Sequence, residues 1–318
     1  MQMLNKMLKD AVTIAIGGHI RPDGDCVGSC IGLYQYIKDN YKDKKADVYL
    51  EEIPDSFHFL KPADVIRHEI PADVTYDLFI CLDCGDKGRL GFSAPLFDRA
   101  KRTFCIDHHI SNKGFASDSY VVPDASSTSE LVYQLLDEEK ISLGTAEALY
   151  LGIVHDTDVF QYSCAEPSTF RMAAKLLEKG IDGPGIIQET FYEKTYAQNQ
   201  ILGRALLESI LFMDKKCIAT YITKKTMDFY GVVPKDLEGI VSQLRLTKGV
   251  EVAIFMYELE KNVYKVSLRS KENVDVCKVA GYFGGGGHKR AAGLTMAGTC
   301  YDVINNLSGQ IEAQLDEV

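Results

Sequence analysis

The sequence lacks the features of a membrane protein and of a protein that binds long nucleic acid. No run of 18 apolar residues occurs in the 318-residue chain, so there is no candidate membrane span. The first ten residues, MQMLNKMLKD, lack the apolar core of a signal peptide, and we expect a cytoplasmic protein. An excess of basic residues is also missing, since 35 Lys and Arg face 45 Asp and Glu, a net charge of −10. This balance favours a small phosphorylated nucleotide or a very short oligonucleotide as the ligand.

The nine cysteines lack the paired spacing of a zinc ribbon. Cys81 and Cys84 form one C-x-x-C, but no second pair accompanies it. We therefore expect free, buried or half-buried thiols in a reducing compartment. Two further cysteines lie near acidic segments, where a thiolate would favour zinc. Cys26 is placed at a predicted helix start and Cys105 is expected to face away from Asp107, so neither is counted as a metal ligand.

The first half of the chain alternates short apolar runs with stretches of helical spacing. The candidate strands are Thr13–Gly18, Val48–Ile53, Leu78–Leu82 and Thr103–Ile106. Apolar residues recur at helical spacing over 27–37, follow the S-x-x-E capping box at Ser127–Glu130, and continue over Thr145–Val154. The alternation predicts an α/β domain over residues 1–188, with a mainly parallel sheet flanked by helices.

The length of the chain favours a second domain. Gly183-Pro184-Gly185 interrupts the pattern, and a helical connector is expected over residues 189–211. A smaller α/β substrate-binding domain then covers 212–318 and ends in a helix over 301–315. Its candidate strands are Cys217–Thr223, Val250–Leu259 and Val263–Leu268, the last two forming a hairpin. We find no internal repeat.

Carboxylates and imidazoles gather at the ends of several candidate strands. His19, Asp23 and Asp25 fall within seven residues, and Pro22 and Gly24 force a turn between them. The same theme recurs at Asp83, at Asp107-His108-His109 and at Asp156. Because ligands of open α/β sheets bind at the carboxyl ends of the strands, we expect these side chains to converge. Oxygen-rich clusters that include imidazole suit Mn²⁺ or Mg²⁺.

Each residue alone has a simpler explanation. An aspartate at a strand end is usually a turn former or a helix cap, and Asp25 could be the N-cap of the helix that follows it. His108 and His109 could be surface residues. Five of the seven histidines nevertheless fall in the candidate segments, namely His19, His108, His109, His155 and His288. Two ions about 3.5–4 Å apart that share a carboxylate would use all the ligands and hold a hydroxide for attack at phosphorus.

A glycine run in the second domain is the other strong feature. Gly284–Gly287 precedes His288, Lys289 and Arg290, and four glycines let backbone N–H groups cradle an anion. A flexible loop also explains such a run. Upstream, Ser267 and Arg269 lie on one face of a strand end, and arginine suits bidentate phosphate binding. Together these residues indicate a clamp for a substrate phosphate.

With these motifs in order, the chain resembles the DHH phosphoesterase superfamily along nearly its whole length. The matching motifs are HIRPDGDCVGS from His19, LDCGD from Leu82, DHH from Asp107, HDT from His155 and GGGGHKRAAG from Gly284. The size and the glycine motif look like the branch of nano-RNases and 3′-phosphoadenosine-5′-phosphate phosphatases. In the fourth motif Asp158 stands where a glycine is common, and His155 where threonine or another small residue is often found.

The resemblance implies a cleft between a catalytic DHH domain and a substrate-binding domain, and two Mn²⁺ ions, with Mg²⁺ or Co²⁺ as substitutes. The implied ligands of the first ion are His19, Asp23 and Asp83. The implied ligands of the second are Asp25, Asp83, His108 and Asp156, with Asp83 as the bridge. His109 would lie just outside this set or near the phosphate. The implied phosphate or nucleotide contacts are Arg269, Gly286, Gly287 and His288.

The expected activity is hydrolysis of very short oligonucleotides such as pApA to mononucleotides, and of phosphoadenosine phosphate to AMP. Four alternatives stay open: a cyclic di-AMP phosphodiesterase, a manganese inorganic pyrophosphatase, a non-catalytic nucleotide-binding module and a processive single-strand exonuclease. The glycine motif speaks against the pyrophosphatase, and the complete ligand set speaks against the non-catalytic module. The acidic chain speaks against the processive exonuclease. A homodimer is left open.

Overall fold

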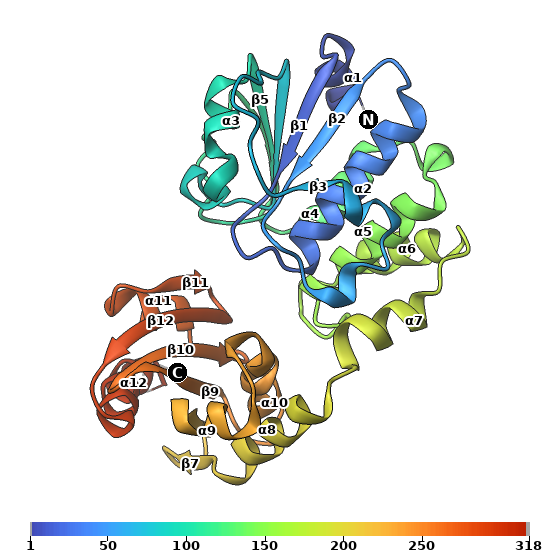
Figure 1. Ribbon diagram of the computed structural model, residues 1–318. Helices are drawn as coiled ribbons and strands as arrows, with labels where there is room; N and C mark the ends of the chain where they lie inside the picture. The colour runs from blue at the N-terminus through green and yellow to red at the C-terminus, as the bar shows by residue number, and fades with distance from the viewer. Residues whose placement is uncertain (1, 316–318) are drawn as a thin grey trace. The chain divides into compact units, whose positions relative to one another are not determined.

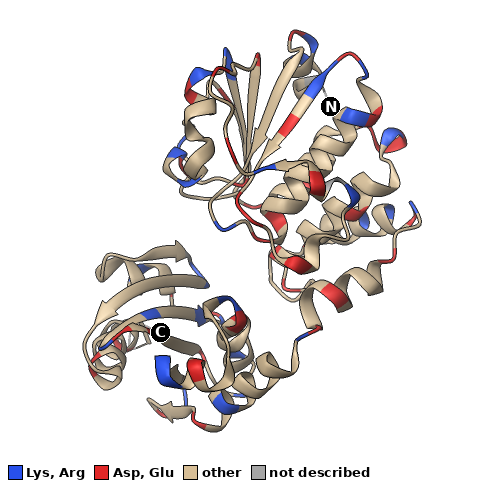
Figure 2. Ribbon diagram, viewed as in Figure 1, with Lys and Arg blue, Asp and Glu red and all other residues tan. Residues whose placement is uncertain are grey.

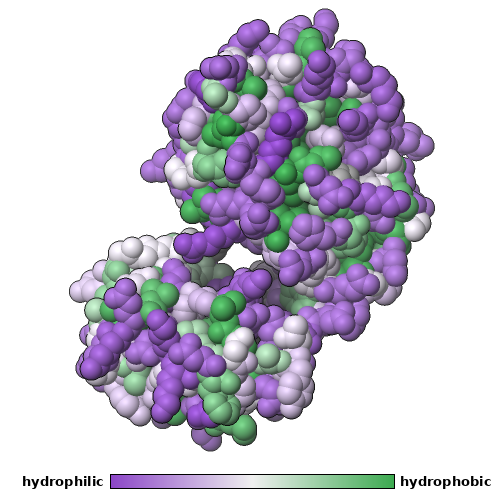
Figure 3. All heavy atoms as spheres, viewed as in Figure 1, coloured by the Kyte–Doolittle hydropathy of each residue, from purple (hydrophilic) through white to green (hydrophobic). Residues whose placement is uncertain are grey.

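The computed structural model describes residues 2–315, with all their side chains except those of Gln2, Pro62 and His288. The chain divides into two compact units, Met1–Glu193 and Lys194–Val318 (Figure 1). Among residues 2–315, no helix combines the length and the apolar character that crossing a bilayer requires. Hydrophilic residues cover most of the visible surface of each unit (Figure 3).

The first unit is built on a six-stranded sheet whose strands are all parallel. The strand order is β3-β2-β1-β4-β5-β6. The strands are β1 (Thr13–Gly17), β2 (Lys45–Tyr49), β3 (Ile66–Arg67), β4 (Leu78–Leu82), β5 (Arg102–Asp107) and β6 (Asp118–Val121). The parallel sheet predicted from the sequence is confirmed, and its central strands β1, β4 and β5 are neighbours.

Helices cover both faces of this sheet (Figure 1). The helices are α1 (Gln2–Lys9), α2 (Gly24–Asn40), α3 (Ala94–Arg99), α4 (Thr128–Leu135), α5 (Leu143–Asp156), α6 (Pro167–Leu177) and α7 (Gly183–Ile187). The larger core lies between the sheet and the helices α2, α4 and α5, where Ile16, Ile31 and Leu149 are fully buried. A smaller core on the opposite face contains Phe79 and, from α3, Phe97.

Most predicted strand boundaries shift by one to three residues, and the prediction departs furthest from the structure at two places. The second strand ends at Tyr49, not at Ile53, because its neighbour β1 ends at Gly17, the residue that pairs with Tyr49. The stretch 189–211 is not one helix. It comprises a π-helical turn over Gln188–Tyr192, an extended Glu193, α8 (Tyr196–Leu207) and the start of a strand at Ile210. Thr195 and Gln198 form a capping box that begins α8 anew.

The second unit contains a mixed six-stranded sheet of order β11-β12-β10-β9-β8-β7. The strands are β7 (Ile210–Phe212), β8 (Cys217–Ile222), β9 (Val252–Glu260), β10 (Val263–Ser270), β11 (Gly286–His288) and β12 (Ala291–Ala297). Only the β8–β9 pair among these described strands is parallel. The predicted hairpin of β9 and β10 is present, and Asn262 takes a left-handed φ of 60° in its turn.

The helices of this unit leave part of one sheet face open. They are α8, α9 (Lys224–Tyr230), α10 (Ile240–Arg245), α11 (Val276–Tyr282) and α12 (Cys300–Leu315). Residues of α11 and α12, such as Val279 and Leu307, form a core against one face. Residues of α8 and α10, such as Ile201 and Leu244, pack on the opposite face with Phe255 of β9. That second face continues onto β10, β12 and β11, whose residues there are half-buried or exposed.

Candidate functional site

The polar residues of the first unit follow three neighbouring strands. His19 lies two residues beyond β1, Asp83 directly follows β4, and Asp107 ends β5 immediately before His108. Figure 2 shows several acidic residues on the loops beyond the carboxyl ends of these strands. Because β1, β4 and β5 are adjacent and parallel, these positions lie at one edge of the sheet.

The turn after His19 is shaped by the cap of α2. Asp23 is the N-cap, and its Oδ1 accepts the backbone N–H of Cys26 at 3.1 Å. The cap is therefore Asp23 and not Asp25, which lies in the first turn of α2 and is buried. Asp23 keeps 63% of its side chain exposed, so its second oxygen is accessible to a ligand. Arg21 takes a left-handed φ of 54° in this turn.

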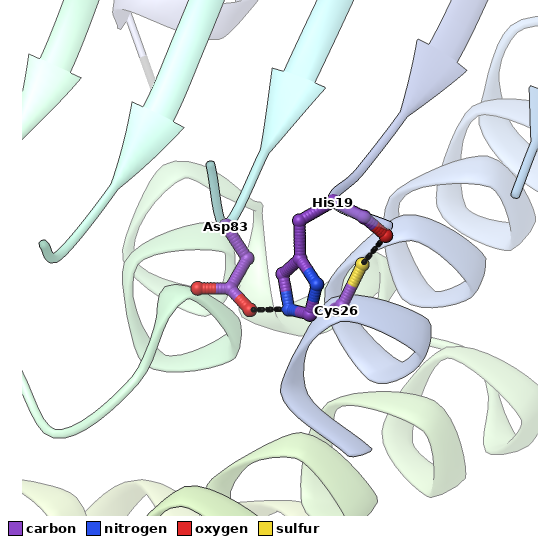
Figure 4. A group of neighbouring side chains, drawn as sticks. All are labelled: His19, Cys26 and Asp83. Carbon is purple, nitrogen blue, oxygen red and sulfur yellow. Dashed lines mark hydrogen bonds and ion pairs between the residues drawn. The ribbon is translucent and has the colours of Figure 1, made fainter. Parts of the chain in front are cut away.

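His19 presents one ring nitrogen to two carboxylates. Its Nδ1 lies 2.8 Å from the carbonyl of Ile20, a contact that assigns the proton to Nδ1. Nε2 then faces Asp83 Oδ2 at 3.3 Å (Figure 4) and lies 3.6 Å from Asp23 Oδ1. Burial alone lowers the pKa of His19, but Cys26 and the bonds to Asp23 and Asp83 raise it above its usual value. The site therefore favours a positive charge at Nε2.

Asp83 has its two oxygens turned to different partners. Oδ2 faces His19, whereas Oδ1 lies 3.7 Å from His108 Nε2 and accepts the hydroxyl of Thr128 at 3.2 Å. Burial raises the pKa of Asp83, but the hydrogen bond and charge of His19, with the charges of His108 and His109, outweigh it and hold the pKa below its usual range. The residue takes a left-handed φ of 54°, a strained backbone held by the bond from its N–H to the Ile106 carbonyl.

His108 repeats the arrangement of His19. Its Nδ1 lies 3.2 Å from the Ala125 carbonyl, and its Nε2 faces Asp156 Oδ2 at 3.2 Å and Asp83 Oδ1 at 3.7 Å. Burial lowers the pKa of His108, but Asp156 and Asp83 raise it to about 9 overall. Asp156 is the last residue of α5, and burial raises its pKa well above the usual value.

Asp25 lies against the first turn of α4. Its Oδ2 accepts the N–H of Thr128 at 2.6 Å and its Oδ1 that of Ser129 at 2.8 Å. These N–H groups at a helix start stabilise the charged carboxylate. Burial and the nearby charge of Asp83 nevertheless raise the pKa of Asp25 to about 7. Ser127 caps α4 as predicted by accepting the N–H of Glu130 at 3.0 Å.

His109 is oriented by a fully buried aspartate. Its Nδ1 lies 2.7 Å from Asp107 Oδ1 and 3.5 Å from Asp83 Oδ1. Asn112 fixes that aspartate by donating to Asp107 Oδ2 at 2.7 Å, and the same Nδ2 lies 3.4 Å from Cys105 Sγ. The expectation that Cys105 faces away from Asp107 is therefore wrong, because residues two apart on a strand share a face.

The arrangement of the two histidines fits divalent cations. Each of His19 and His108 gives its Nδ1 proton to a backbone carbonyl, the pattern typical of metal-bound imidazole. Each then turns its Nε2 toward carboxylate oxygens, a position where either a proton or a divalent cation offsets the negative charge. Asp25, His108 and Asp156 form one group of donor atoms within 4.8 Å of one another. A second group contains His19, Asp83 and Cys26, which the sequence analysis had set aside.

His155 of the fourth motif packs against Gly24 of the first motif, and it belongs to none of these donor groups. Its Nε2 lies 2.9 Å from Thr190 Oγ1, and its ring packs edge-on against Phe57 and Phe191. Burial lowers its pKa to about 4, so the imidazole is neutral. A Cβ at Gly24 would lie 2.3 Å from this ring, which explains the glycine of the first motif.

The residues after Asp156 form a left-handed turn. Asp158, Val159 and Phe160 have φ values of 52°, 56° and 61°. Thr157, which is fully buried, holds the turn by accepting the N–H of Phe160 on its hydroxyl at 3.0 Å. A glycine adopts such a conformation without strain, so the backbone accounts for the glycine that is common at position 158 in this motif.

The second unit brings its predicted residues onto one sheet face. Ser267 and Arg269 alternate with buried residues on β10 and are half-buried. Gly293 of β12 pairs with Ser267 on one side and with Gly286 on the other. Lys265, which the sequence analysis missed, shares the β10 face by the same alternation, and its Nζ lies about 4.0 Å from where a Cβ of Gly293 would be.

The glycine run is not the flexible loop that the sequence left open as an alternative to a phosphate clamp. Gly286–His288 forms the edge strand β11, paired to β12. Side chains at Gly285 and Gly287 would meet the β12 backbone at 2.5 Å, whereas Gly286 has open space beside it. The glycines therefore allow close strand packing and leave backbone accessible near position 286. The backbone of His288 pairs with Ala291, and its side chain lies outside the described part of the structure.

Two family models match the sequence. Residues 13–153 match the DHH family, N-terminal domain, and residues 214–317 match the DHHA1 domain. The chain is 25% identical to a protein of Bacillus subtilis named bifunctional oligoribonuclease and PAP phosphatase NrnA, over 89% of each chain. A protein of the same name from Thermus thermophilus is 27% identical over 91% of this chain and 86% of its own.

A solved structure has the same fold throughout. The crystal structure of an exopolyphosphatase-related protein from Bacteroides fragilis superposes with a TM-score of 0.90 at 26% sequence identity. The match covers 98% of this chain and 95% of that one. The α/β architecture predicted from the sequence for both units is therefore confirmed.

Proposed function

This chain belongs to the DHH family of phosphoesterases, hydrolases that act on phosphate esters, and we propose that it hydrolyses very short oligonucleotides to mononucleotides and phosphoadenosine phosphate to AMP. The names of its relatives, bifunctional oligoribonuclease and PAP phosphatase, support this pair of substrates. The net charge of −10 supports short substrates over long nucleic acid. Nine free thiols suit a reducing compartment such as the cytoplasm.

The observation that carries the proposal is the environment of Asp83. Two imidazoles with backbone-anchored Nδ1 atoms face opposite oxygens of this one buried carboxylate. The proposed ligands of one divalent cation are His19, Asp23 and Asp83, and those of the other are Asp25, Asp83, His108 and Asp156. Such cations, Mn²⁺ in the first instance, would neutralise phosphate charge and lower the pKa of a water molecule.

The remaining residues of the site position the reacting groups in this proposal. Asp107 fixes the His109 ring through Nδ1, so that His109 contacts the scissile phosphate in one orientation. Thr128 and the start of α4 hold the oxygens of Asp83 and Asp25. These contacts keep the carboxylates in place before substrate binds.

The second unit supplies the grip on a terminal phosphate in this proposal. The proposed contacts are the side chains of Lys265, Ser267 and Arg269, the backbone of Gly286 and Gly287, and His288. Small residues at positions 286, 291 and 293 leave the strand backbone accessible beside Arg269, which supports close approach of an anion.

The proposal is tested by product analysis over a substrate panel. The panel contains pAp, pApA, cyclic di-AMP, pyrophosphate and oligomers of increasing length, each with Mn²⁺ and with Mg²⁺. We expect AMP from pAp and pApA, with rates that fall as the oligomers lengthen. Preferred turnover of cyclic di-AMP or pyrophosphate, or rates that rise with length, would contradict the proposal.

A further inference from the structure

A buried thiol lies inside one of the three donor groups of the first unit, the third of which is formed by Asp83, His108 and His109. His19, Cys26 and Asp83 each contribute one donor atom, and the three atoms lie within 4.8 Å of one another. Figure 4 shows His19 and Asp83 facing each other at the ends of their strands, with the Cys26 sulfur on α2 directed at the His19 backbone carbonyl. All three side chains are buried. Imidazole, thiolate and carboxylate together are ligands typical of Zn²⁺.

The backbone around Cys26 holds the sulfur in this place. Asp23 accepts the Cys26 N–H at 3.1 Å and so fixes the first turn of α2. On the other side Gly18 provides the space, because a Cβ there would lie only 2.3 Å from Cys26 Sγ. The Sγ itself is 3.9 Å from the His19 carbonyl. The sulfur therefore occupies a space between the end of β1 and the first turn of α2.

We propose that the thiolate of Cys26 is a ligand of the cation held by His19 and Asp83, and that this position consequently prefers Zn²⁺ or Co²⁺ to Mn²⁺ or Mg²⁺. The inference rests on the proposed function, since it requires a cation between His19 and Asp83. On binding, the S–H bond breaks, its proton passes to water, and the sulfur electron pair forms the bond to the cation. A sulfur ligand favours a softer cation than oxygen ligands alone do.

Cys30 offers a matched control on the same helix. It lies one turn beyond Cys26 in α2 and is likewise fully buried. It belongs to none of the donor groups found among the described residues. Cys30→Ala therefore removes a buried thiol of the same helix without removing the proposed ligand.

The test is Co²⁺ binding to the metal-free, full-length protein, followed by absorption spectroscopy during titration with CoCl₂. The visible d–d bands report any bound Co²⁺, and a near-ultraviolet sulfur-to-cobalt band reports a thiolate ligand. We expect both signals in the wild type and in Cys30→Ala. We expect only the d–d bands in Cys26→Ala and in Cys26→Ser, which keeps the size of the side chain. Circular dichroism checks that each variant is folded.

Zinc provides an independent readout. X-ray absorption of the Zn²⁺-loaded wild type should show one sulfur neighbour at about 2.3 Å beside nitrogen and oxygen at about 2.0–2.2 Å. In Cys26→Ala the sulfur neighbour should be lost. Zn²⁺ affinity should then fall by at least the roughly 10–100-fold typical of residues that only support a ligand.

The outcomes separate this inference from the proposed function. Visible bands without the sulfur band in the wild type would overturn the role of Cys26 and leave the metal centre intact. A sulfur band that persists in folded Cys26→Ala would also overturn it. No Co²⁺ signal at all in folded wild type would contradict the metal centre itself, and the role of Cys26 with it.

Discussion

The two units build their candidate sites in opposite ways. In the first unit, His19 and Asp83 are buried at the ends of neighbouring strands and Asp25 is buried at the start of α2, where backbone groups fix these side chains. In the second unit, Arg269 and Ser267 lie half-buried on an open strand face. Buried like charges need a cation to offset their repulsion, whereas an open basic face needs only an anion to arrive. The first arrangement suits catalysis by bound metal and the second suits substrate binding.

The largest expected effect comes from removing the shared carboxylate of the first unit. Asp83→Ala should lower the turnover of pApA by about a thousandfold or more, because both cation positions lose a ligand. Steady-state kinetics in MnCl₂ measures the loss, and circular dichroism should show a retained fold. Asp98→Ala is the control, since Asp98 is an exposed aspartate that pairs with Lys87 on the surface. Near-normal activity in Asp83→Ala would contradict the role of this residue.

Arg269→Ala should distinguish the second unit from the first, because it should weaken substrate binding and leave the reaction step unchanged. A charge-assisted hydrogen bond contributes about 1.5–3 kcal/mol, so KM for pApA should rise roughly 10–150-fold with kcat little changed. Lys261→Ala is the control, because Lys261 is exposed in the turn between β9 and β10. A fall in kcat at unchanged KM would instead assign Arg269 to the reaction step.

The pH dependence of stability should reveal the buried charges of the first unit. The pKa of Asp25 is raised to about 7 by burial and by Asp83, so the folded protein binds a proton there more tightly than the unfolded chain does. The stability that this proton contributes is lost as pH rises through 7. The pKa of His108, raised to about 9 by Asp156 and Asp83 against the effect of burial, adds stability below pH 6.5 that is lost toward pH 9. The Tm of the metal-free protein should therefore fall from pH 5 to pH 8.

MnCl₂ should raise the Tm more at pH 8 than at pH 5, because the cation takes the place of the protons that are lost. Hydrogen exchange locates the effect. Protection by Mn²⁺ should appear at residues 19–25 and 107–109 and not over 263–270. Equal protection of both units, or a larger Tm shift at pH 5, would contradict the comparison.

The smallest expected effect concerns two left-handed turns, one in each unit. In the second unit, three consecutive residues from Met213 to Lys215 have positive φ. In the first unit, Asp158 begins a similar run of three. Lys215→Gly should stabilise the protein by about 0.5 kcal/mol. The substitution removes about 1–2 kcal/mol of backbone strain, but glycine also gives the unfolded chain more conformational entropy, which offsets part of the gain. Asp158→Gly should be near neutral, because aspartate tolerates this conformation better. Urea denaturation measures both, and a larger gain for Asp158→Gly would reverse the expectation.

The sequence was sufficient to predict the parallel sheet and the edge at which His19, Asp83 and His108 meet, because each follows a short apolar strand. It was not sufficient to separate the roles of Asp23 and Asp25, since either spacing permits a helix cap. The role proposed for Cys26 depends on the space that Gly18 leaves for its sulfur, which is a tertiary feature. The prediction that Cys105 faces away from Asp107 was wrong although the sequence was sufficient, because residues two apart on a strand share a face.

In the second unit the alternation of β10 predicted the shared face of Ser267 and Arg269. The same alternation contains Lys265, so this residue could have been found from the sequence. The strand β11 could not, because glycines have little strand propensity and Gly286–His288 is a strand only through its pairing with β12. The break at Glu193 was hidden because apolar and polar residues keep helical spacing across it.

The most direct test of the account is anomalous diffraction from crystals of this protein soaked in MnCl₂. We predict two Mn²⁺ peaks in the first unit that share Asp83, one bound by His19 Nε2 and Asp83 Oδ2 and the other by His108 Nε2 and Asp83 Oδ1. No peak beside Asp83, or peaks that leave one of the two histidines without a cation, would contradict it.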